Sequence, residues 1–202
     1  MAASSSSQLQ RAKPLPLILA SSSPRRLMLL QQIGIVPDQV VSPDIDESPD
    51  REELPRAYVA RMAAAKAAAA VSTDCLVLAA DTVVAAGRRI LPKAEDGSAV
   101  HACLTLLSGR RHRVMTAVVL VAPDGRSTAR LVESAVTFNR LTDTQIERYV
   151  ALREGEGKAG GYAINGHAAS FIRFLSGSYS AVVGLPLFET AQLLRGHGWQ
   201  VP

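Results

Sequence analysis

Short, almost continuously apolar runs alternate with amphipathic segments along the chain. Residues 15–20 (LPLILA) and 75–84 (CLVLAADTVV) are apolar runs of the kind that form strands buried on both faces of a sheet. Residues 24–33 carry apolar side chains at near-helical spacing from Leu27 to Ile33. The pattern therefore predicts that the chain opens as strand, turn and helix.

The rest of the chain continues this mixture of helices and strands. Asp124-Gly125 is a hairpin signal between two β-rich runs, and Thr142 with Gln145 has the pattern of a capping box that starts a helix. In chain order, we expect helices over 54–71 and 98–107, strands over 112–122 and 128–138, a helix from 142 to about 152, a glycine-dense loop over 155–166, a strand over 170–175 and a helix over 186–196. Strands mixed with helices, with one hairpin among them, predict an α/β protein with a mixed sheet.

Length and composition are those of one globular unit. The chain has 202 residues, of which 48% are hydrophobic and 20% are charged. Residues 1–14 are polar, rich in serine and without an apolar period, so we expect a disordered tail there and a single domain over residues 15–202. A transit signal is the alternative for this serine-rich start. No window approaches the ~20 apolar residues of a membrane span, and the tail shows no hydrophobic segment of a secretion signal.

Cysteine, histidine and aromatic usage narrow the classes of function. Cys75 and Cys103 have no CxxC partner, so we expect two reduced cysteines in a cytoplasmic protein rather than a disulfide framework or a metal knuckle. The histidines show no zinc-binding spacing. The net charge of +4 favours anionic partners. Basic residues are scattered, however, and only 4% of residues are aromatic, so we expect neither nucleic acid nor a membrane as partner.

The first predicted helix begins with an unusual pattern of charge. Ser23 and Pro24 are typical of a helix start, with a hydroxyl at the N-cap and proline at the first helical position. Arg25 and Arg26 follow, although the first turn already carries the positive end of the helix dipole. Two interpretations are open. Either both guanidinium groups point into solvent, or they join the exposed N–H groups in binding an anion such as an oligophosphate.

One acidic residue interrupts the second buried run. Asp81 lies within VLAADTVV, where a carboxylate must be paired, bind a cation or lie at the strand end beside a cleft. A loop rich in proline and acidic residues, 42–55, precedes it in the chain. The acidic side chains at its start are Asp44, Asp46 and Glu47. Two or three oxygens from this loop, with Asp81, suit Mg²⁺ and leave coordination positions for phosphate oxygens; the alternative is a solvated loop.

Other patterns of phosphate binding and hydrolysis are weak or absent. No segment matches GxxxxGK[ST], which excludes a P-loop. GEGKAG at 155–160 matches GxGxxG, but it follows a predicted helix rather than a strand, so we interpret it as a coincidence of spacing. No GxSxG elbow surrounds Ser22 or Ser23, which disfavours a serine hydrolase. Lys66 and Lys93 are candidate phosphate ligands, with ordinary surface lysines as the alternative.

Longer stretches strengthen the case for phosphate chemistry. They are LILASSSPRRLMLL at 17–30, IDE at 45–47, ARMAAAKA at 60–67, AADTVV at 79–84, LPK at 91–93, LSGRRHRVMTAV at 107–118 and GKAGGYAINGHAASFIRFLSGSYSAVVGLPLFET at 157–190. In this order they resemble the Maf family of nucleoside triphosphate pyrophosphatases, also called septum-formation-inhibitor proteins. The resemblance extends from about Leu15 to the end of the chain and leaves only the tail outside.

The resemblance implies a fold and an activity. The fold would be an elongated, twisted mixed β-sheet flanked by helices, with two lobes, a central cleft and a homodimeric assembly. The activity would be hydrolysis of a nucleoside triphosphate to the monophosphate and pyrophosphate, with a divalent cation, Mg²⁺ first and Mn²⁺ or Co²⁺ as alternatives. By resemblance, Asp81 is the proton acceptor, and Glu47 with Asp81 organises the metal. The implied phosphate contacts are Arg26, Lys66 and Lys93, with hydroxyl contacts from Ser21 or Ser23.

Three positions are associated with the choice of base in the family. Arg25 and Thr82 resemble the branch that acts on dTTP and UTP, whereas Asn165 stands where that branch carries glutamine and is one methylene shorter. The resemblance therefore implies hydrolysis of dTTP and UTP, or of related modified pyrimidine nucleotides. A non-catalytic nucleotide- or RNA-binding regulator of cell division is the alternative, and it predicts salt-dependent binding of oligonucleotides without turnover.

Overall fold

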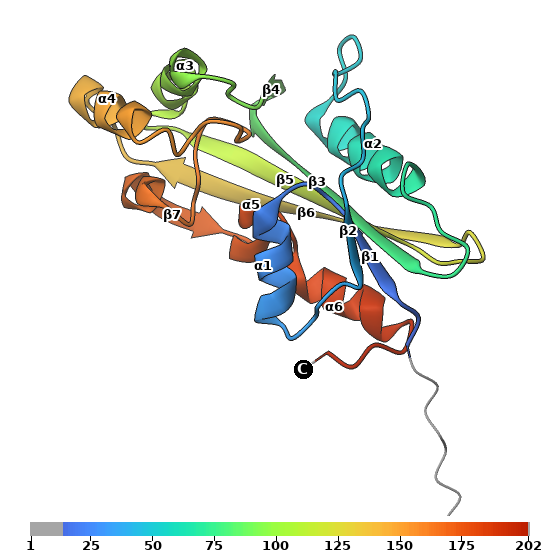
Figure 1. The fold of residues 1–202 in the computed structure, drawn as a ribbon. Coiled ribbons are helices and arrows are strands. Elements are labelled where there is room, and N and C mark those ends of the chain that lie inside the picture. The colour runs from blue at the N-terminus through green and yellow to red at the C-terminus, as the bar shows by residue number, and fades with distance from the viewer. Residues whose placement is uncertain (1–13, 202) are drawn as a thin grey trace, which may run out of the picture.

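A twisted seven-stranded sheet forms the framework of the protein and confirms the predicted α/β class with a mixed sheet (Figure 1). The computed structural model describes residues 14–201, so the predicted tail lies outside the described residues except for Pro14. The strand order is β2 (Gln39–Val41), β1 (Leu17–Ala20), β3 (Leu76–Ala86), β5 (Arg111–Val121), β6 (Ser127–Phe138) and β7 (Ile172–Ser176), with β4 (Arg89–Leu91) paired to β3. β1 runs parallel to β2 and β3, whereas the other pairings are antiparallel.

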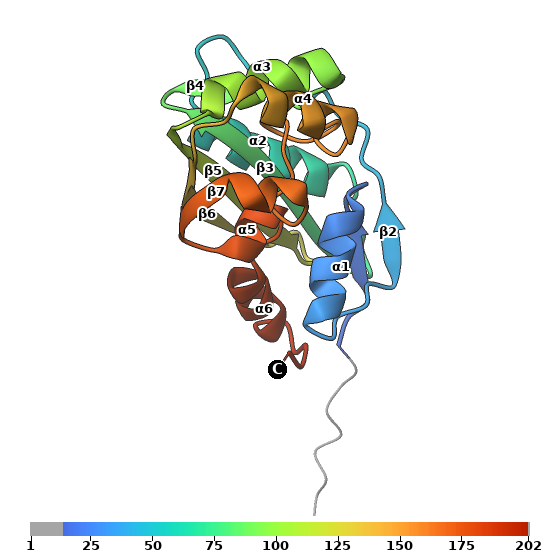
Figure 2. The same cartoon turned by 90° about the vertical axis from the view of Figure 1, so that its left-hand side faces the viewer.

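Helices cover both faces of the sheet because the strands bury apolar side chains on both sides. On one face α2 (Pro55–Ala68) packs against Val77 and Ala79 of β3. On the other face α1 (Pro24–Gln32) and α6 (Leu187–Arg195) pack near Leu76 and Leu78 of the same strand. Figures 1 and 2 show α2 on the opposite side of the sheet from α1 and α6. Successive residues of β3 therefore face different layers.

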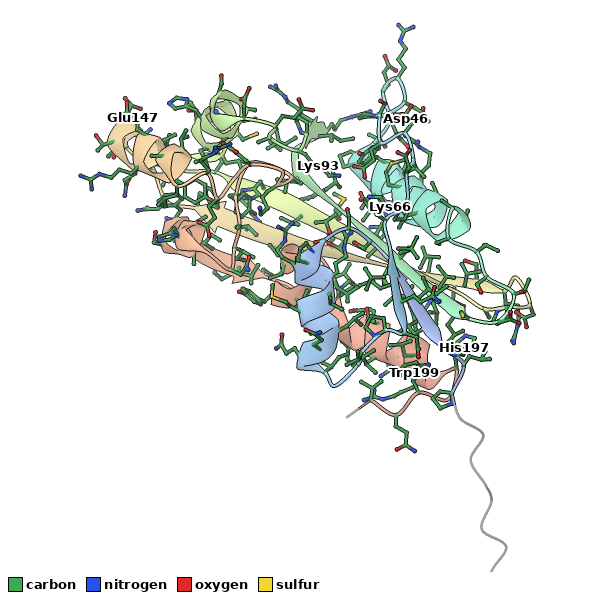
Figure 3. The ribbon with its side chains drawn as sticks, in the orientation of Figure 1. Asp46, Lys66, Lys93, Glu147, His197 and Trp199 are labelled. Atoms are coloured by element: carbon green, nitrogen blue, oxygen red, sulfur yellow. The ribbon has the colours of Figure 1, made fainter. Side chains whose placement is uncertain are left out.

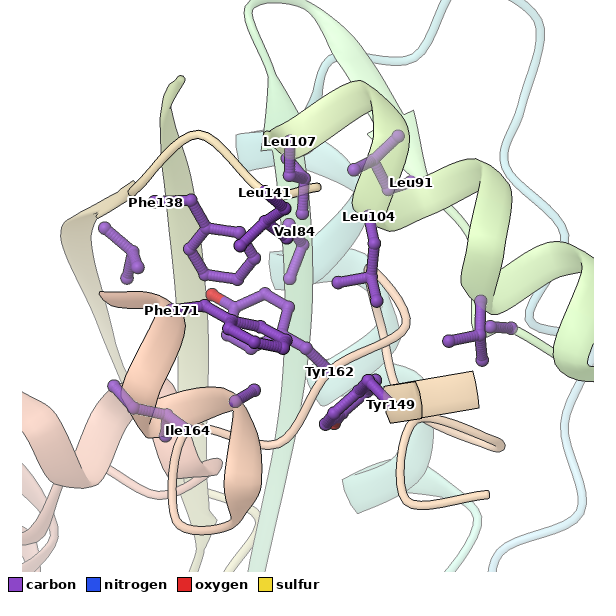
Figure 4. Close-up of a cluster of buried hydrophobic side chains, with 14 of the residues drawn as sticks. Val84, Leu91, Leu104, Leu107, Phe138, Leu141, Tyr149, Tyr162, Ile164 and Phe171 are labelled. Carbon is purple, nitrogen blue, oxygen red and sulfur yellow. The ribbon is translucent and has the colours of Figure 1, made fainter. Parts of the chain in front are cut away.

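A third cluster of buried side chains lies at the far end of the sheet. It joins α3 (Gly97–Leu107), α4 (Asp143–Ala151) and the 3₁₀ helix η1 (His167–Phe171) to the strands, with the short α5 (Tyr179–Val183) beside it. Figure 2 shows α3 and α4 side by side at this end. The centre of this cluster, called the aromatic cluster below, consists of aromatic rings in edge contact (Figure 4). Phe138 contacts Tyr162 and Phe171, and Phe171 contacts Tyr149.

One edge of β3 is incompletely paired, and this gap positions the site described below. Leu76–Ala79 pairs with β1, and Val84–Ala86 pairs with β4. Between them, Ala80–Val83 has no strand partner on that edge among the described residues, although β5 pairs with the opposite edge throughout. At such an unpaired stretch, side chains from both faces of the sheet, and the backbone between them, can reach the same opening.

Most predicted elements are confirmed, with ends displaced by one to three residues, as is common where helices and strands fray. The capping box at Thr142 and Gln145 is present, and Asp124-Gly125 lies in the β5–β6 hairpin turn. GEGKAG lies in a loop after α4, so the dinucleotide interpretation was rightly rejected. Four short elements, β2, β4, η1 and α5, were not predicted. No helix within residues 14–201 has the length and apolar character needed to cross a bilayer.

The prediction for the start of α1 was wrong in one respect. Ser23 occupies the N-cap position, but its hydroxyl accepts no hydrogen bond from the first turn of the helix. Its own N–H donates instead to Ser21 Oγ at 3.2 Å. The first turn of α1 therefore has neither a side-chain cap nor an acidic residue to balance its positive end.

Candidate active site

A cavity of about 260 Å³ opens at the unpaired edge of β3, between the α1 end of the sheet and the aromatic cluster. Its lining joins the turn before α1, the loop before α2, the middle of β3 and the loop before η1. All the site residues expected from the sequence line it: Ser21, Ser23, Arg25, Arg26, Glu47, Lys66, Asp81, Thr82, Lys93 and Asn165. The structure thus brings together side chains that lie up to 144 positions apart in the chain (Ser21 to Asn165).

Asp81 forms a buried ion pair on the α2 face of the sheet. Lys66 Nζ, from α2, lies 2.6 Å from Asp81 Oδ1 and 2.8 Å from Glu47 Oε1. Asp81 is only 5% exposed and Lys66 only 6%. Lys93 binds the other oxygen of Glu47. Figure 3 labels Lys66 on α2 and Lys93 on the segment after β4. Two carboxylates and two ammonium groups therefore form one connected network.

The two lysines control the charge of Glu47. Partial burial opposes its ionisation, but hydrogen bonds and the positive charges of Lys66 and Lys93 outweigh burial and lower the pKa of Glu47. Tyr58, from α2, donates its hydroxyl to the Glu47 backbone oxygen at 2.8 Å. Glu47 is therefore ionised at neutral pH and held in place through both its side chain and its backbone.

Arg26 lies buried on the opposite face, where the hydrogen-bond partners of its guanidinium among the described residues are neutral groups. Nε donates to Gly184 O at 2.8 Å, one terminal nitrogen donates to Ser21 Oγ at 3.0 Å, and the other lies 3.4 Å from Thr82 Oγ1. Burial lowers its pKa, while the charge of Asp81 raises it. Within residues 14–201, no carboxylate forms an ion pair with Arg26. A buried cation without a protein anion is a strong binding group for an anionic ligand.

Arg25 also lines the cavity, and burial lowers its pKa. Both arginines at the start of α1 therefore lie at the cavity, and the interpretation in which both point into solvent is not favoured. Ser21 is buried and accepts from Arg26, which fixes the turn that carries both arginines. Asn165 is exposed at the other side of the opening.

Asp81 and Thr82 are adjacent in β3 and point to opposite faces of the sheet. Asp81 meets Lys66 from α2, whereas Thr82 meets Arg26 from α1 and Thr116 from β5. Only at the open edge of β3 can one ligand reach both side chains. A second cavity of about 410 Å³, on the α2 side, shares Glu47, Asp81 and Lys93 with the first.

Some expectations need correction, and some lining residues were missed. Asp44 and Asp46 do not line either cavity among the described residues, and Asp46 Oδ1 instead accepts from Ser48 N at 2.8 Å. Lys158 and Tyr162 line the cavity but were not predicted. The segment GKAGGY of the family resemblance contains both, and this was the available signal. Burial, followed by the charge of Arg25, lowers the pKa of Lys158.

Glu47 and Asp81 fit a divalent cation. The Lys66 ammonium group contacts one oxygen of each carboxylate, so the two carboxylates lie close enough to bind the same positive charge. Mg²⁺ commonly binds one or two carboxylates and completes its shell with water and substrate phosphates. The described residues contain no group of three or more acidic, histidine or cysteine side chains that would form a closed metal cage. An open site of this kind suits a cation that arrives with a phosphate ligand.

The fold and the site define an α/β protein with a cleft at an open strand edge, where cationic side chains lie next to a paired acid. The sequence model of the family described as "Maf-like protein" matches residues 16–197, and the chain belongs to this family.

Relatives extend this finding. The chain is 64% identical over 187 residues to a protein named "dTTP/UTP pyrophosphatase" from Gluconobacter oxydans, covering 89% of this chain and 86% of that protein. A Granulibacter bethesdensis protein with the same name is 57% identical, covering 95% and 97%. Among solved structures, a nucleoside-triphosphatase / dITP/XTP pyrophosphatase from Mycobacterium abscessus is similar at 19% identity with a TM-score of 0.40, covering 63% of this chain and 74% of that one. That similarity is too distant to carry an argument about the site.

Proposed function

We propose that this protein is a nucleoside triphosphate pyrophosphatase that hydrolyses dTTP and UTP, or related modified pyrimidine nucleotides, to the monophosphate and pyrophosphate. The observation that carries the proposal is the buried, unpaired Arg26 in the same cavity as the Asp81–Lys66 pair. The cavity thus joins a site for phosphate charge to a carboxylate, and close relatives are named for this activity. These names describe an enzyme, so the non-catalytic regulator considered from the sequence is less favoured.

Asp81 is the residue that acts on the attacking water. Lys66 donates to Oδ1, and Oδ2 is the oxygen that orients the water and accepts its proton. The water oxygen forms a bond to the α-phosphorus, while the bond from that phosphorus to the oxygen bridging to the β-phosphate breaks. Pyrophosphate leaves with the bonding electrons. Positioning and electrostatics dominate chemistry of this kind.

Cationic side chains stabilise the charge that develops on the leaving group. Arg26, Lys66 and Lys93 line the cavity and supply this positive charge. A divalent cation, Mg²⁺ or alternatively Mn²⁺ or Co²⁺, would be held by Glu47 and Asp81 and would neutralise charge on the phosphate oxygens. In the structure the Lys66 ammonium bridges the same two acids, so a cation held there would leave Lys66 available for phosphate contacts. Ser21 and Ser23 add hydroxyl contacts in the turn before α1.

Arg25, Thr82 and Asn165 select the base. All three line the cavity, and Asn165 lies on the loop before η1 rather than on the phosphate-binding turn. Its amide offers one donor group and one acceptor to the edge of a pyrimidine. Because asparagine is one methylene shorter than glutamine, its contact with the base depends closely on where the backbone of this loop lies.

The protein is further proposed to act in the cytoplasm as a homodimer. Both cysteines are free, which supports a reducing compartment. β7 lies at one end of the strand order and carries Phe174, which is 57% exposed. Among the described residues the outer edge of β7 has no strand partner, and an edge of this kind can pair with a strand of a second copy. Light scattering coupled to size-exclusion chromatography measures the mass: the homodimer predicts twice the chain mass, and the mass of one chain contradicts it.

A substrate panel tests the activity. Turnover of dTTP, UTP, CTP, GTP and methylated pyrimidine triphosphates is followed by pyrophosphate release, with and without added divalent cation. The proposal predicts turnover of dTTP and UTP well above that of GTP, and loss of turnover without the cation. Binding of oligonucleotides without turnover of any triphosphate would instead support the regulator.

A further inference from the structure

The glycine loop, residues 155–166, connects the two ends of the proposed substrate site. Ala159 forms an isolated antiparallel bridge with Lys93, whose side chain lies at the phosphate end of the cavity. Asn165, near the other end of the loop, lines the same cavity. The course of this loop therefore sets where Asn165 lies relative to Lys93 and Asp81.

Two buried tyrosine hydroxyls hold the end of the loop from inside the protein. The Ala163 N–H donates to Tyr149 Oη at 3.1 Å, and Tyr162 Oη lies 2.8 Å from His112 Nε2. Tyr149 belongs to α4 and His112 to β5, so two elements outside the loop fix its position. Among the described residues, Tyr149 lies outside the lining of both cavities, and it reaches the site only through the loop.

Both contacts lie in the aromatic cluster, and the three side chains that make them, His112, Tyr149 and Tyr162, are uncharged at neutral pH. Burial lowers the pKa of His112 to about 4, against an opposing effect of the Arg110 backbone. Burial raises the pKa of Tyr149 to about 12 and that of Tyr162 further. Figure 4 shows Tyr149 and Tyr162 among apolar side chains. A hydrogen bond in such surroundings is costly to break, because its partner is left unsatisfied away from water.

We propose that Tyr149, together with His112 acting through Tyr162, positions Asn165 for selection of the base. Ala163 lies only two residues before Asn165, so a shift at its N–H moves the asparagine backbone directly. Asparagine has little reach to compensate for such a shift, and recognition by hydrogen bonds requires placement within about 0.5 Å. The inference rests on the proposed function, because it assigns positioning residues to the base end of that same site.

Substituting Tyr149→Phe removes one hydroxyl and leaves the ring in place. The kinetic constants for dTTP and for CTP are measured by pyrophosphate release, beside Tyr179→Phe, an exposed tyrosine, as the matched control. We expect kcat/KM for dTTP to fall about tenfold, chiefly through KM, with kcat and the CTP constants nearly unchanged. The preference for dTTP over CTP then falls by the same factor, and Tyr179→Phe leaves it unaltered.

A double-mutant cycle with Asn165→Ala tests whether the effect passes through Asn165. The inference predicts that Tyr149→Phe no longer changes the dTTP preference once Asn165 is alanine. Equal loss of kcat for both substrates, or an effect that persists in the Asn165→Ala background, overturns it. Should Tyr149→Phe fail to fold, Tyr162→Phe breaks the contact with His112 and takes the same test. A wild-type protein that does not hydrolyse dTTP would refute the proposed function itself, which separates the two failures.

Discussion

His112 couples the stability of this protein to pH, and the coupling has a definite sign. The histidine is 2% exposed among aromatic side chains, and burial lowers its pKa from 6.5 to about 4. The unfolded chain therefore binds a proton at His112 below about pH 6.5, whereas the native protein does so only near pH 4. Burial of the neutral His112 therefore leaves the free energy of unfolding undiminished above about pH 6.5. The free energy of unfolding then decreases as the pH falls toward about 4. Over that window about 2.5 pKa units correspond to about 3–4 kcal/mol, at about 1.4 kcal/mol per unit.

The substitution His112→Gln removes this titration and keeps an amide that can meet Tyr162. Urea denaturation of both proteins, followed by circular dichroism between about pH 7 and pH 4.5, gives the free energy of unfolding at each pH. We expect the free energy of unfolding of the wild type, minus that of the variant, to fall by about 1.4 kcal/mol per pH unit below about pH 6. Carboxylates such as Glu47 titrate in both proteins and cancel in the difference. A difference that stays constant across the range would refute the claim that His112 is buried and neutral.

Three further predictions address a helix start, a close packing contact and the anion site. Thr142→Ala should lower the free energy of unfolding by about 1 kcal/mol, because it removes the capping box of α4, and it should leave dTTP turnover unchanged. An unaltered midpoint of urea denaturation would contradict this prediction. Gly160→Ala should lower the melting temperature and raise KM, because φ is +69° and a Cβ would meet a Val84 methyl at 2.8 Å; a stabilised protein would show that the loop packs differently. Arg26→Lys should reduce kcat/KM for dTTP by about 100-fold, because lysine cannot reproduce three directed donors; turnover within twofold of wild type would exclude the anion role.

The sequence contains strong signals for the long elements and weak ones for the short. β3 and β5 are 11 residues each and apolar throughout much of their length, so their existence follows from composition alone. β2 has three exposed residues, and only its pairing with β1 makes it a strand. A segment of this kind carries no periodic pattern, because its structure depends on a neighbour distant in the chain.

The site residues were predictable individually, but their arrangement was not. Asp81 stands out as an acid in an apolar run, and Arg25 with Arg26 as cations at a helix start. That Lys66 bridges Asp81 and Glu47 depends on how α2 packs over β3, which no local pattern specifies.

His112 was considered only as a metal ligand, although the sequence held a better signal. It precedes Val114 and Thr116 at a spacing of two along a predicted strand, and all three side chains are buried. A histidine on the inner face of a strand is more often a core residue than a metal ligand, and here Nε2 lies 2.8 Å from Tyr162 Oη. Its partner, Tyr162, comes from a loop whose path could not be predicted.

Replacing the strand carboxylate provides the most direct test of the account. Asp81→Asn keeps the shape of the side chain and removes its charge, while Asp46→Asn, on the loop outside the cavity, serves as the matched control. Both are assayed for pyrophosphate release from dTTP after circular dichroism has established that they fold. The account predicts that Asp81→Asn loses about 1,000-fold or more in kcat while Asp46→Asn retains wild-type turnover. A folded Asp81→Asn protein that hydrolyses dTTP at nearly the wild-type rate would contradict it.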